Sequence, residues 1–294
     1  MKKTHLKIQL VQASLAYTLY ENDEAEDKSS KLVLLHGAGV AGELTWAYVA
    51  HYLKNWHQIL VPDFPNAGQS YFLDEDLNEI ERACQLEEIS SSIVDLLNYL
   101  SWQKIDLVGY SLGGLIALDI NRKTIEESDC DLSIGKFGLI EPALFSAKSE
   151  TEAKEFRASY KPIAEQVLKD PESKAPFLSF LNKVSPNRIE NPQADEIALK
   201  RLMQRPLGFA YSVSAVSEFI ERNDSARDDL IAHLSRIEGS GVGIIGELSD
   251  GGLLEAQEFI ASKVNHWDVQ VVPKADHGLV YLKPKKIANI LNQL

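Results

Sequence analysis

Short apolar runs alternate with amphipathic segments along most of the chain. Runs rich in β-forming residues begin at Lys31, Ile59, Ile105, Phe137, Val242 and Val269. Between them, apolar residues recur at helical spacing, as at Ile89, Ile93, Leu96, Leu97 and Leu100. An alternation of short buried strands with amphipathic helices predicts a parallel sheet that is covered by helices on both faces.

Two stretches near the N-terminus depart from this alternation. Residues 6–20 alternate or run apolar around Ser14, which predicts a hairpin of two strands. Residues 71–85 are acidic, and we expect a surface loop or lid there.

The alternation also stops between residues 143 and 226. This region has a helical pattern that several prolines interrupt, and it contains no convincing strand. The pattern resumes near Asp228. We therefore expect a core domain built from residues 1–142 and 227–294, with residues 143–226 inserted as a helical cap. The alternative is a separate helical subdomain with no part in catalysis.

Composition narrows the class of protein. The chain has 294 residues and a formal net charge of −13, which argues against nucleic acid or an anionic membrane as a partner. Cys84 and Cys130 cannot form a disulfide framework or a C-x-x-C pair. No apolar run resembles a signal peptide or reaches membrane-spanning length. We expect a cytoplasmic monomer or homodimer without membrane insertion that acts on a small molecule.

The stretch Gly109-Tyr110-Ser111-Leu112-Gly113 joins an apolar run directly to a helical one. Gly-x-Ser-x-Gly between a strand and a helix is typical of a nucleophile elbow, in which a strained turn exposes the serine hydroxyl. The glycines avoid clashes in so tight a turn. The alternative is a glycine-rich turn whose serine is incidental.

A nucleophilic serine needs a histidine base, and the histidine needs a carboxylate to hold its tautomer. His277 follows the last predicted strand, where a loop can bring it to the same sheet edge as Ser111. Asp250, just past the strand that begins at Val242, is the favoured acid. Glu141 and Glu247 are rivals, because each also ends a predicted strand.

An oxyanion that develops on the substrate needs N–H donors. The backbone N–H of Leu112 supplies one, and that of Ala38, in the glycine-rich loop after the first buried strand, supplies the second. His36 begins this loop, and we expect it to fix the loop by hydrogen bonds rather than act as a base.

Together these motifs resemble the α/β-hydrolase fold superfamily in its capped serine-hydrolase branch. The matching features are the His-Gly-x-Gly loop at 36–39, the Asp-x-Pro-x-x-Gly-x-Ser turn at 63–70, the elbow at 109–113, the loop that carries Asp250, and His277. The resemblance implies a mostly parallel eight-stranded sheet flanked by helices, with a helical cap. Asn66 stands where the family usually has glycine, and asparagine also suits left-handed backbone. Asp250 lies one residue later than the usual acid.

The function expected from this resemblance is a serine hydrolase that needs no metal or organic cofactor. It would cleave an ester or thioester of a small to medium, partly apolar substrate through an acyl-enzyme intermediate. The same triad also serves carbon–carbon bond hydrolases, amidases, peptidases, lyases and cofactor-free haloperoxidases, and the fold also serves as a ligand receptor with slow or no turnover. A pure interaction protein is a third alternative. Candidate lining residues of the cap are its aromatic side chains: Phe145, Phe156, Tyr160, Phe209 and Tyr211. Core packing of the cap would explain these aromatic residues equally well.

Overall fold

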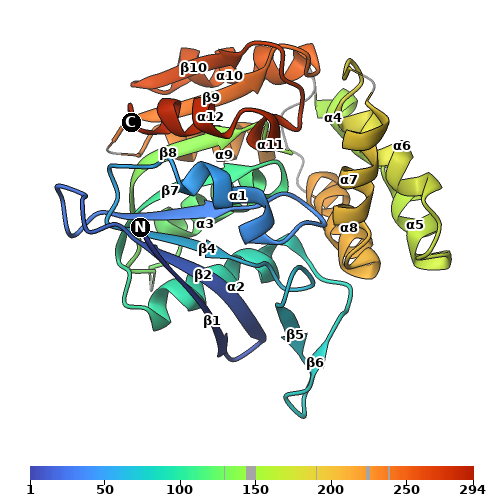
Figure 1. Ribbon diagram of the computed structural model, residues 1–294, viewed down its shortest axis with the longest axis horizontal. Coiled ribbons are helices and arrows are strands. Elements are labelled where there is room, and N and C mark those ends of the chain that lie inside the picture. Colours follow the sequence, from blue (N-terminus) through green and yellow to red (C-terminus); the bar gives the residue numbers. More distant parts are fainter. Residues whose placement is uncertain (129, 144–149, 190, 223–225, 238) are drawn as a thin grey trace.

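The computed structural model shows a central sheet with helices on both faces and a group of helices gathered at one side of it (Figure 1). It describes residues 1–294 apart from 129, 144–149, 190, 223–225 and 238. The strands are β1 (Lys2–Gln9), β2 (Ala13–Glu21), β3 (Lys31–Leu35), β4 (Gln58–Pro62), β5 (Tyr71–Leu73), β6 (Glu79–Ile80), β7 (Lys104–Tyr110), β8 (Ser133–Ile140), β9 (Gly241–Gly246) and β10 (Trp267–Val272).

The sheet is mostly parallel. Its strand order is β10-β9-β8-β7-β3-β4-β2-β5-β6, and β1 pairs with β2. Strands β3, β4, β7, β8, β9 and β10 pair in parallel, whereas β1, β2, β5 and β6 form antiparallel pairs. The expected hairpin over residues 6–20 is confirmed as β1 and β2.

The described part of the chain contributes ten strands, not the expected eight. The additional strands are β5 and β6, in the acidic segment expected to be a loop. Phe72 of β5 is fully buried and pairs with Ala13 of β2. One buried aromatic residue therefore extends the sheet through a stretch whose overall polarity favoured a loop.

Two layers of helices bury the two faces of the sheet. The helices of this region are α1 (Gly42–Ala50), α2 (Leu86–Tyr99), α3 (Leu112–Glu126), α9 (Ala226–Leu234), α10 (Gly251–Lys263), α11 (Leu279–Leu282) and α12 (Pro284–Leu291). Apolar residues of α2, α3, α9 and α10 belong to one core, and those of α1, α11 and α12 belong to the other.

Strand β3 shows how one apolar run serves both cores. Val33 and Leu35 pack in the core with α2 and α3, whereas Leu32 and Leu34 pack in the core with α1. Successive side chains of a strand point to opposite faces, so a parallel strand between two helical layers must be apolar at every position. This explains the continuous apolar run in the sequence.

Between β8 and α9 the described residues form helices alone. These are α4 (Glu150–Ala158), α5 (Lys161–Lys169), α6 (Ala175–Val184), α7 (Pro192–Leu202) and α8 (Pro206–Arg222). They have an apolar core of their own, in which Tyr160, Val167, Phe177 and Phe209 are buried. Figure 1 shows them together, in yellow and orange, beside one end of the sheet.

Arg205 ties this group of helices to the sheet region. Its Nη1 donates to the carbonyl oxygens of Gly68 and Ser70 at 2.9 and 3.1 Å. It also forms an ion pair with Glu81 and lies over the ring of Tyr71, 4.2 Å from the centroid.

No helix in the described residues combines the length and the apolar character that crossing a membrane requires.

Candidate active site

Ser111 lies at the turn between β7 and α3 in strained backbone geometry. Its φ is 54° and its ψ is −117°, a conformation that non-glycine residues rarely adopt. The neighbouring glycines are required by crowding, because a Cβ on Gly109 would lie 2.1 Å from the carbonyl oxygen of Gly113. A Cβ on Gly113 would lie 2.3 Å from the carbonyl oxygen of Leu35. The turn has the features expected of a nucleophile elbow.

His277 lies in the loop that follows β10, at the sheet edge where β7 ends. The hydroxyl of Tyr110 donates to the carbonyl oxygen of His277 at 2.7 Å, and the two rings lie 5.2 Å apart between centroids. Gly278 N donates to the Asp276 carboxylate at 2.7 Å and shapes the same loop. These contacts fix both the backbone and the ring of the histidine.

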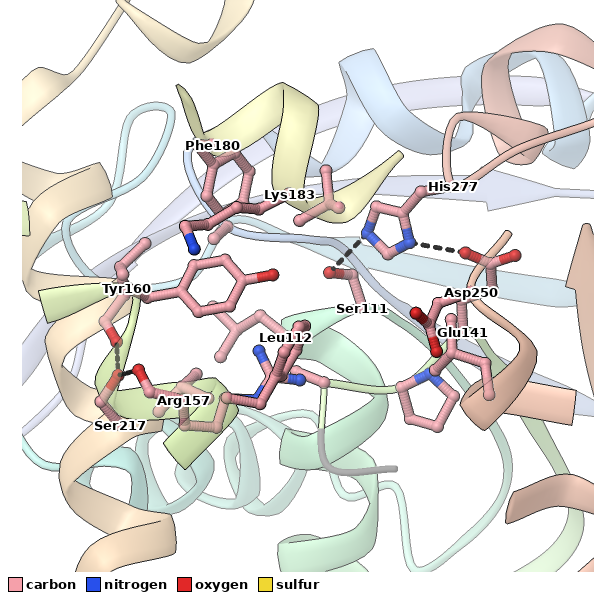
Figure 2. A pocket seen from close by; sticks show the side chains of 18 residues that line it. Ser111, Leu112, Glu141, Arg157, Tyr160, Phe180, Lys183, Ser217, Asp250 and His277 are labelled. Carbon is pink, nitrogen blue, oxygen red and sulfur yellow. Dashed lines mark hydrogen bonds and ion pairs between the residues drawn. The ribbon is translucent and has the colours of Figure 1, made fainter. Parts of the chain in front are cut away.

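A chain of hydrogen bonds joins a serine, a histidine and a glutamate. His277 Nε2 lies 3.1 Å from Ser111 Oγ, and His277 Nδ1 lies 2.6 Å from Glu141 Oε2 (Figure 2). Because a buried carboxylate accepts from Nδ1–H, the ring nitrogen that faces the serine is left free to accept the hydroxyl proton. The arrangement can therefore activate Ser111 as a nucleophile.

Glu141 is held in place by more than the histidine. It is 1% exposed, and its Oε1 accepts hydrogen bonds from Gly246 N, at 2.7 Å, and from the hydroxyl of Ser249. These donors, together with the histidine, fix the position of the carboxylate.

The expectation that Asp250 is the partner of His277 is wrong. Asp250 caps the N-terminus of α10, and its Oδ1 accepts from Gly252 N at 2.8 Å. The partner is Glu141, one of the two rivals, and the other, Glu247, accepts from Lys274 N at 2.8 Å. Strand β8, which Glu141 follows, is the neighbour of β7, whereas the strand before Asp250 lies one position further away.

His36 has the structural place that the sequence predicted for it. It is fully buried, its Nδ1–H donates to Gly37 O at 2.7 Å, and its Nε2 accepts from Phe64 N at 2.9 Å. Burial lowers the pKa of His36, opposed by the charge of Asp63 and by the hydrogen bond to Gly37. Asn66, in the adjacent turn, has a left-handed φ of 67°, as expected from the sequence.

Two cavities meet at Ser111 and His277. The smaller has a volume of about 60 Å³, and the larger one of about 560 Å³. Ala38 lines both, and Leu112, the first residue of α3, lines the smaller one. The first amide of a helix has no acceptor within the helix, so the Leu112 N–H is available beside Ser111.

The candidate aromatic residues have different places. Phe156 and Tyr160 line the smaller cavity. Phe209 is fully buried and packs against Phe177 and Phe180, their ring centroids 5.0 and 4.9 Å away, so core packing explains it. Tyr211 lines neither of the two cavities. Phe145 lies outside the described residues.

Sequence reasoning missed two cationic residues of the smaller cavity. Arg157 of α4 and Lys183 of α6 both line it. Arg157 lies in a polar helical stretch, and Lys183 lies near the end of an amphipathic one. A basic residue is usually solvated in either place, so the sequence held no signal that sets them apart.

No group of three or more His, Cys, Asp or Glu side chains within the described ranges is arranged to hold a metal ion. Both cysteines are free thiols. Burial raises the pKa of the Cys84 thiol to about 12.

Comparison with known proteins shows which protein family the chain is similar to. A family model described as "Alpha/beta hydrolase family" matches residues 32–290. Among curated proteins, the chain is 25% identical over 114 residues to pyrrolizixenacetamide deacetylase from Xenorhabdus hominickii. That match spans 39% of this chain and only 38% of the deacetylase.

Solved structures match over nearly the whole length. An esterase from Thermogutta terrifontis has a TM-score of 0.73 and 19% identity, covering 99% of this chain and 97% of the esterase. A hydrolase from Pseudomonas aeruginosa has a TM-score of 0.70 and 18% identity, covering 98% of this chain and 97% of the hydrolase. At such low identity these likenesses show a shared fold.

Proposed function

Because the chain belongs to the α/β-hydrolase family, which it matches over residues 32–290, we propose that it is a serine hydrolase with Ser111 as its nucleophile. The observation that carries the proposal is the hydrogen-bonded series Ser111–His277–Glu141, whose serine and histidine line both cavities. A strained serine, an oriented histidine and a buried carboxylate are the parts that acyl transfer requires.

The proposed reaction has two stages. Ser111 Oγ attacks the substrate carbonyl while His277 Nε2 takes its proton, and Glu141 stabilises the imidazolium that forms. The backbone N–H groups of Leu112 and Ala38 bind the oxyanion. His277 returns the proton to the leaving group, and water then releases the acyl group by the same steps in reverse order.

The substrate proposed is an ester or thioester with a small to medium, partly apolar body. The lining of the smaller cavity supports this, since Phe156, Phe180, Val213 and Val216 provide apolar surface beside Ser111. The two cavities give separate room for the two sides of the scissile bond.

The deacetylase match supports amide hydrolysis as a second candidate. Both reactions pass through the same acyl-enzyme, so they differ in the leaving group that His277 must protonate.

Residues 143–226 are proposed to form a cap that selects the substrate. The support is that α4, α6 and α8 contribute side chains to the smaller cavity, and α6 and α7 to the larger one. The first half of α8 packs with α5, α6 and α7 in one apolar core, which would hold these helices together over the site, and the second half of α8 packs in a core of the sheet region.

The test is covalent labelling with a fluorophosphonate, followed by mass mapping of the adduct. We expect rapid labelling confined to Ser111 and none in Ser111→Ala. The wild-type protein and Ser111→Ala are then assayed for hydrolysis of a panel of short-chain esters, thioesters and amides. Folded protein that takes no label, or that is labelled equally well after Ser111→Ala, would overturn the proposal.

A further inference from the structure

Arg157 places a guanidinium in the smaller cavity without a carboxylate partner. Its Nε is buried and has no hydrogen-bond partner, and no ion pair from Arg157 is found among the residues that the structure describes. Figure 2 shows Arg157 and Tyr160 reaching into the pocket from the same wall, on the side that faces Ser111. Arg157 as a whole is half-buried, and a buried arginine nitrogen such as its Nε usually donates to an acceptor.

The two carboxylates that line this cavity do not meet Arg157. Glu141 already accepts from His277, Gly246 and Ser249. Asp250 accepts from Gly252 N and forms no ion pair with Arg157. The charge of the guanidinium is thus uncompensated by the described part of the chain.

Aromatic rings offset only part of this cost. The guanidinium carbon of Arg157 lies 5.3 Å from the ring centroid of Phe156 and 5.4 Å from that of Tyr160. Such contacts stabilise the positive charge but leave its N–H donors unused. In agreement, burial lowers the pKa of Arg157, with Tyr160 opposing the change.

A second cation reinforces the first. Lys183 lines the same cavity, where its Nζ donates to Ser159 Oγ at 3.0 Å and lies 5.6 Å from the ring centroid of Tyr160. The lining of the cavity thus holds two basic side chains beside two acidic ones, Glu141 and Asp250, whereas the chain as a whole has a net charge of −13. An anionic ligand therefore meets less negative charge in this cavity than over the rest of the protein.

We propose that Arg157 binds a carboxylate of the substrate inside the smaller cavity, so that the enzyme prefers esters that carry an acidic group close to the scissile bond. The inference rests on the proposed hydrolase function and names its substrate class. The planar guanidinium suits a carboxylate, which it can bind through two parallel hydrogen bonds. Because this cavity is the smaller of the two, short acidic esters are the substrates to test first.

The experiment compares matched neutral and anionic esters with the wild-type protein. For an acid on the acyl side, the pairs are monoethyl succinate with ethyl butanoate and monoethyl glutarate with ethyl pentanoate. For an acid on the alcohol side, the butanoyl ester of glycolate is compared with ethyl butanoate. We expect kcat/KM to be roughly 10- to 100-fold higher for the anionic member on one of the two sides, as for a buried hydrogen bond to a charged group. Equal or lower kcat/KM for the anionic esters on both sides would refute the proposal and leave the hydrolase function intact.

A binding measurement tests the role of Arg157 without requiring that any ester is hydrolysed. Monomethyl glutarate should slow fluorophosphonate labelling of Ser111 at concentrations where dimethyl glutarate has no effect. Equal protection by the two compounds contradicts the role of Arg157 even if no ester of the panel is hydrolysed. If Ser111 takes no label at all, the proposed function itself fails.

Variants then test whether Arg157 is the residue that causes the preference for anionic esters. In Arg157→Gln the anionic and neutral esters should be hydrolysed within about twofold of each other, and Arg157→Lys should restore part of the difference. Lys161→Gln is the matched control. Lys161 of α5 forms an ion pair with Glu221 of α8 and lines neither cavity. A preference that persists in Arg157→Gln refutes the assignment, and the wild-type comparison decides the matter if this variant does not fold.

Discussion

Glu141 Oε2 lies 2.6 Å from His277 Nδ1, although 136 residues separate the two in the sequence. The loop after β9 was expected to supply the acid, but the last residue of β9 and this loop instead supply two of the donors that hold Glu141. These are Gly246 N and the hydroxyl of Ser249. The carboxylate therefore follows the end of β8, and two of its hydrogen-bond donors come from the end of β9 and the loop after it.

The first prediction concerns the identity of the acid. Glu141→Gln should lower kcat by about 1,000- to 10,000-fold, because an amide cannot hold the histidine tautomer or stabilise the imidazolium. Asp250→Asn should change kcat by less than about tenfold, since asparagine also caps a helix and Asp250 accepts from Gly252 N and not from His277. Steady-state kinetics of the two variants on one ester, with circular dichroism to verify folding, provide the measurement. A larger loss in Asp250→Asn than in Glu141→Gln would reverse the assignment.

The fold could be predicted from the sequence because the same pattern of strand and helix recurs along the chain. Each strand of the parallel part is a short apolar run between amphipathic helices, and the elbow motif lies between β7 and α3. The short strands β5 and β6 were missed because a strand of two or three residues has too little pattern to stand out from an acidic stretch.

The acid could not be chosen from sequence because three carboxylates follow strands. The choice depends on strand order and loop direction, which a linear pattern does not contain. Glu141 directly follows β8 with a left-handed φ of 44°, so its side chain leaves the strand in a direction that alternation does not foresee. Arg157 was missed for a different reason, since only tertiary packing distinguishes it from a solvated arginine.

The second prediction concerns the glycines of the elbow. Gly113→Ala would place a Cβ 2.3 Å from the carbonyl oxygen of Leu35, a backbone atom that cannot move without disturbing β3. We expect poor expression or a loss of more than about 3 kcal/mol in the free energy of unfolding, as for severe overpacking. Gly251→Ala is the control, because a Cβ there meets nothing within 4 Å, and helix propensity should stabilise it by up to about 1 kcal/mol. Urea denaturation of both variants checks the difference, and equal stability would show that the turn can relax.

The third prediction concerns pH. His36 accepts from Phe64 N through Nε2, so the folded protein needs the neutral ring, and burial lowers its pKa. The unfolded chain takes up the proton first, near the ordinary pKa of about 6.5. The contribution of His36 is therefore complete above that pH and is lost as the pH falls below it toward the lower folded-state pKa.

Thermal unfolding measured from pH 8 to pH 5 tests this behaviour. The wild type should lose its advantage in Tm over His36→Phe as the pH falls, because the variant cannot titrate at this position. A constant difference between wild type and His36→Phe over this range would contradict the prediction.

The last prediction concerns the attachment of helices α4–α8 to the sheet region. Arg205 precedes α8 and donates to Gly68 O and Ser70 O, and its ion pair with Glu81 is only 13% and 21% exposed at the two side chains. Arg205→Gln would leave Glu81 and both carbonyl groups without their donor, and we expect the free energy of unfolding to fall by about 2 to 4 kcal/mol. Arg222→Gln is the matched control, because its ion pair with Glu87 is more exposed and should contribute less than about 1 kcal/mol. Urea denaturation compares the two losses, and limited proteolysis reports whether α4–α8 are cut first in Arg205→Gln. Equal losses in the two variants would mean that apolar packing, rather than Arg205, attaches these helices.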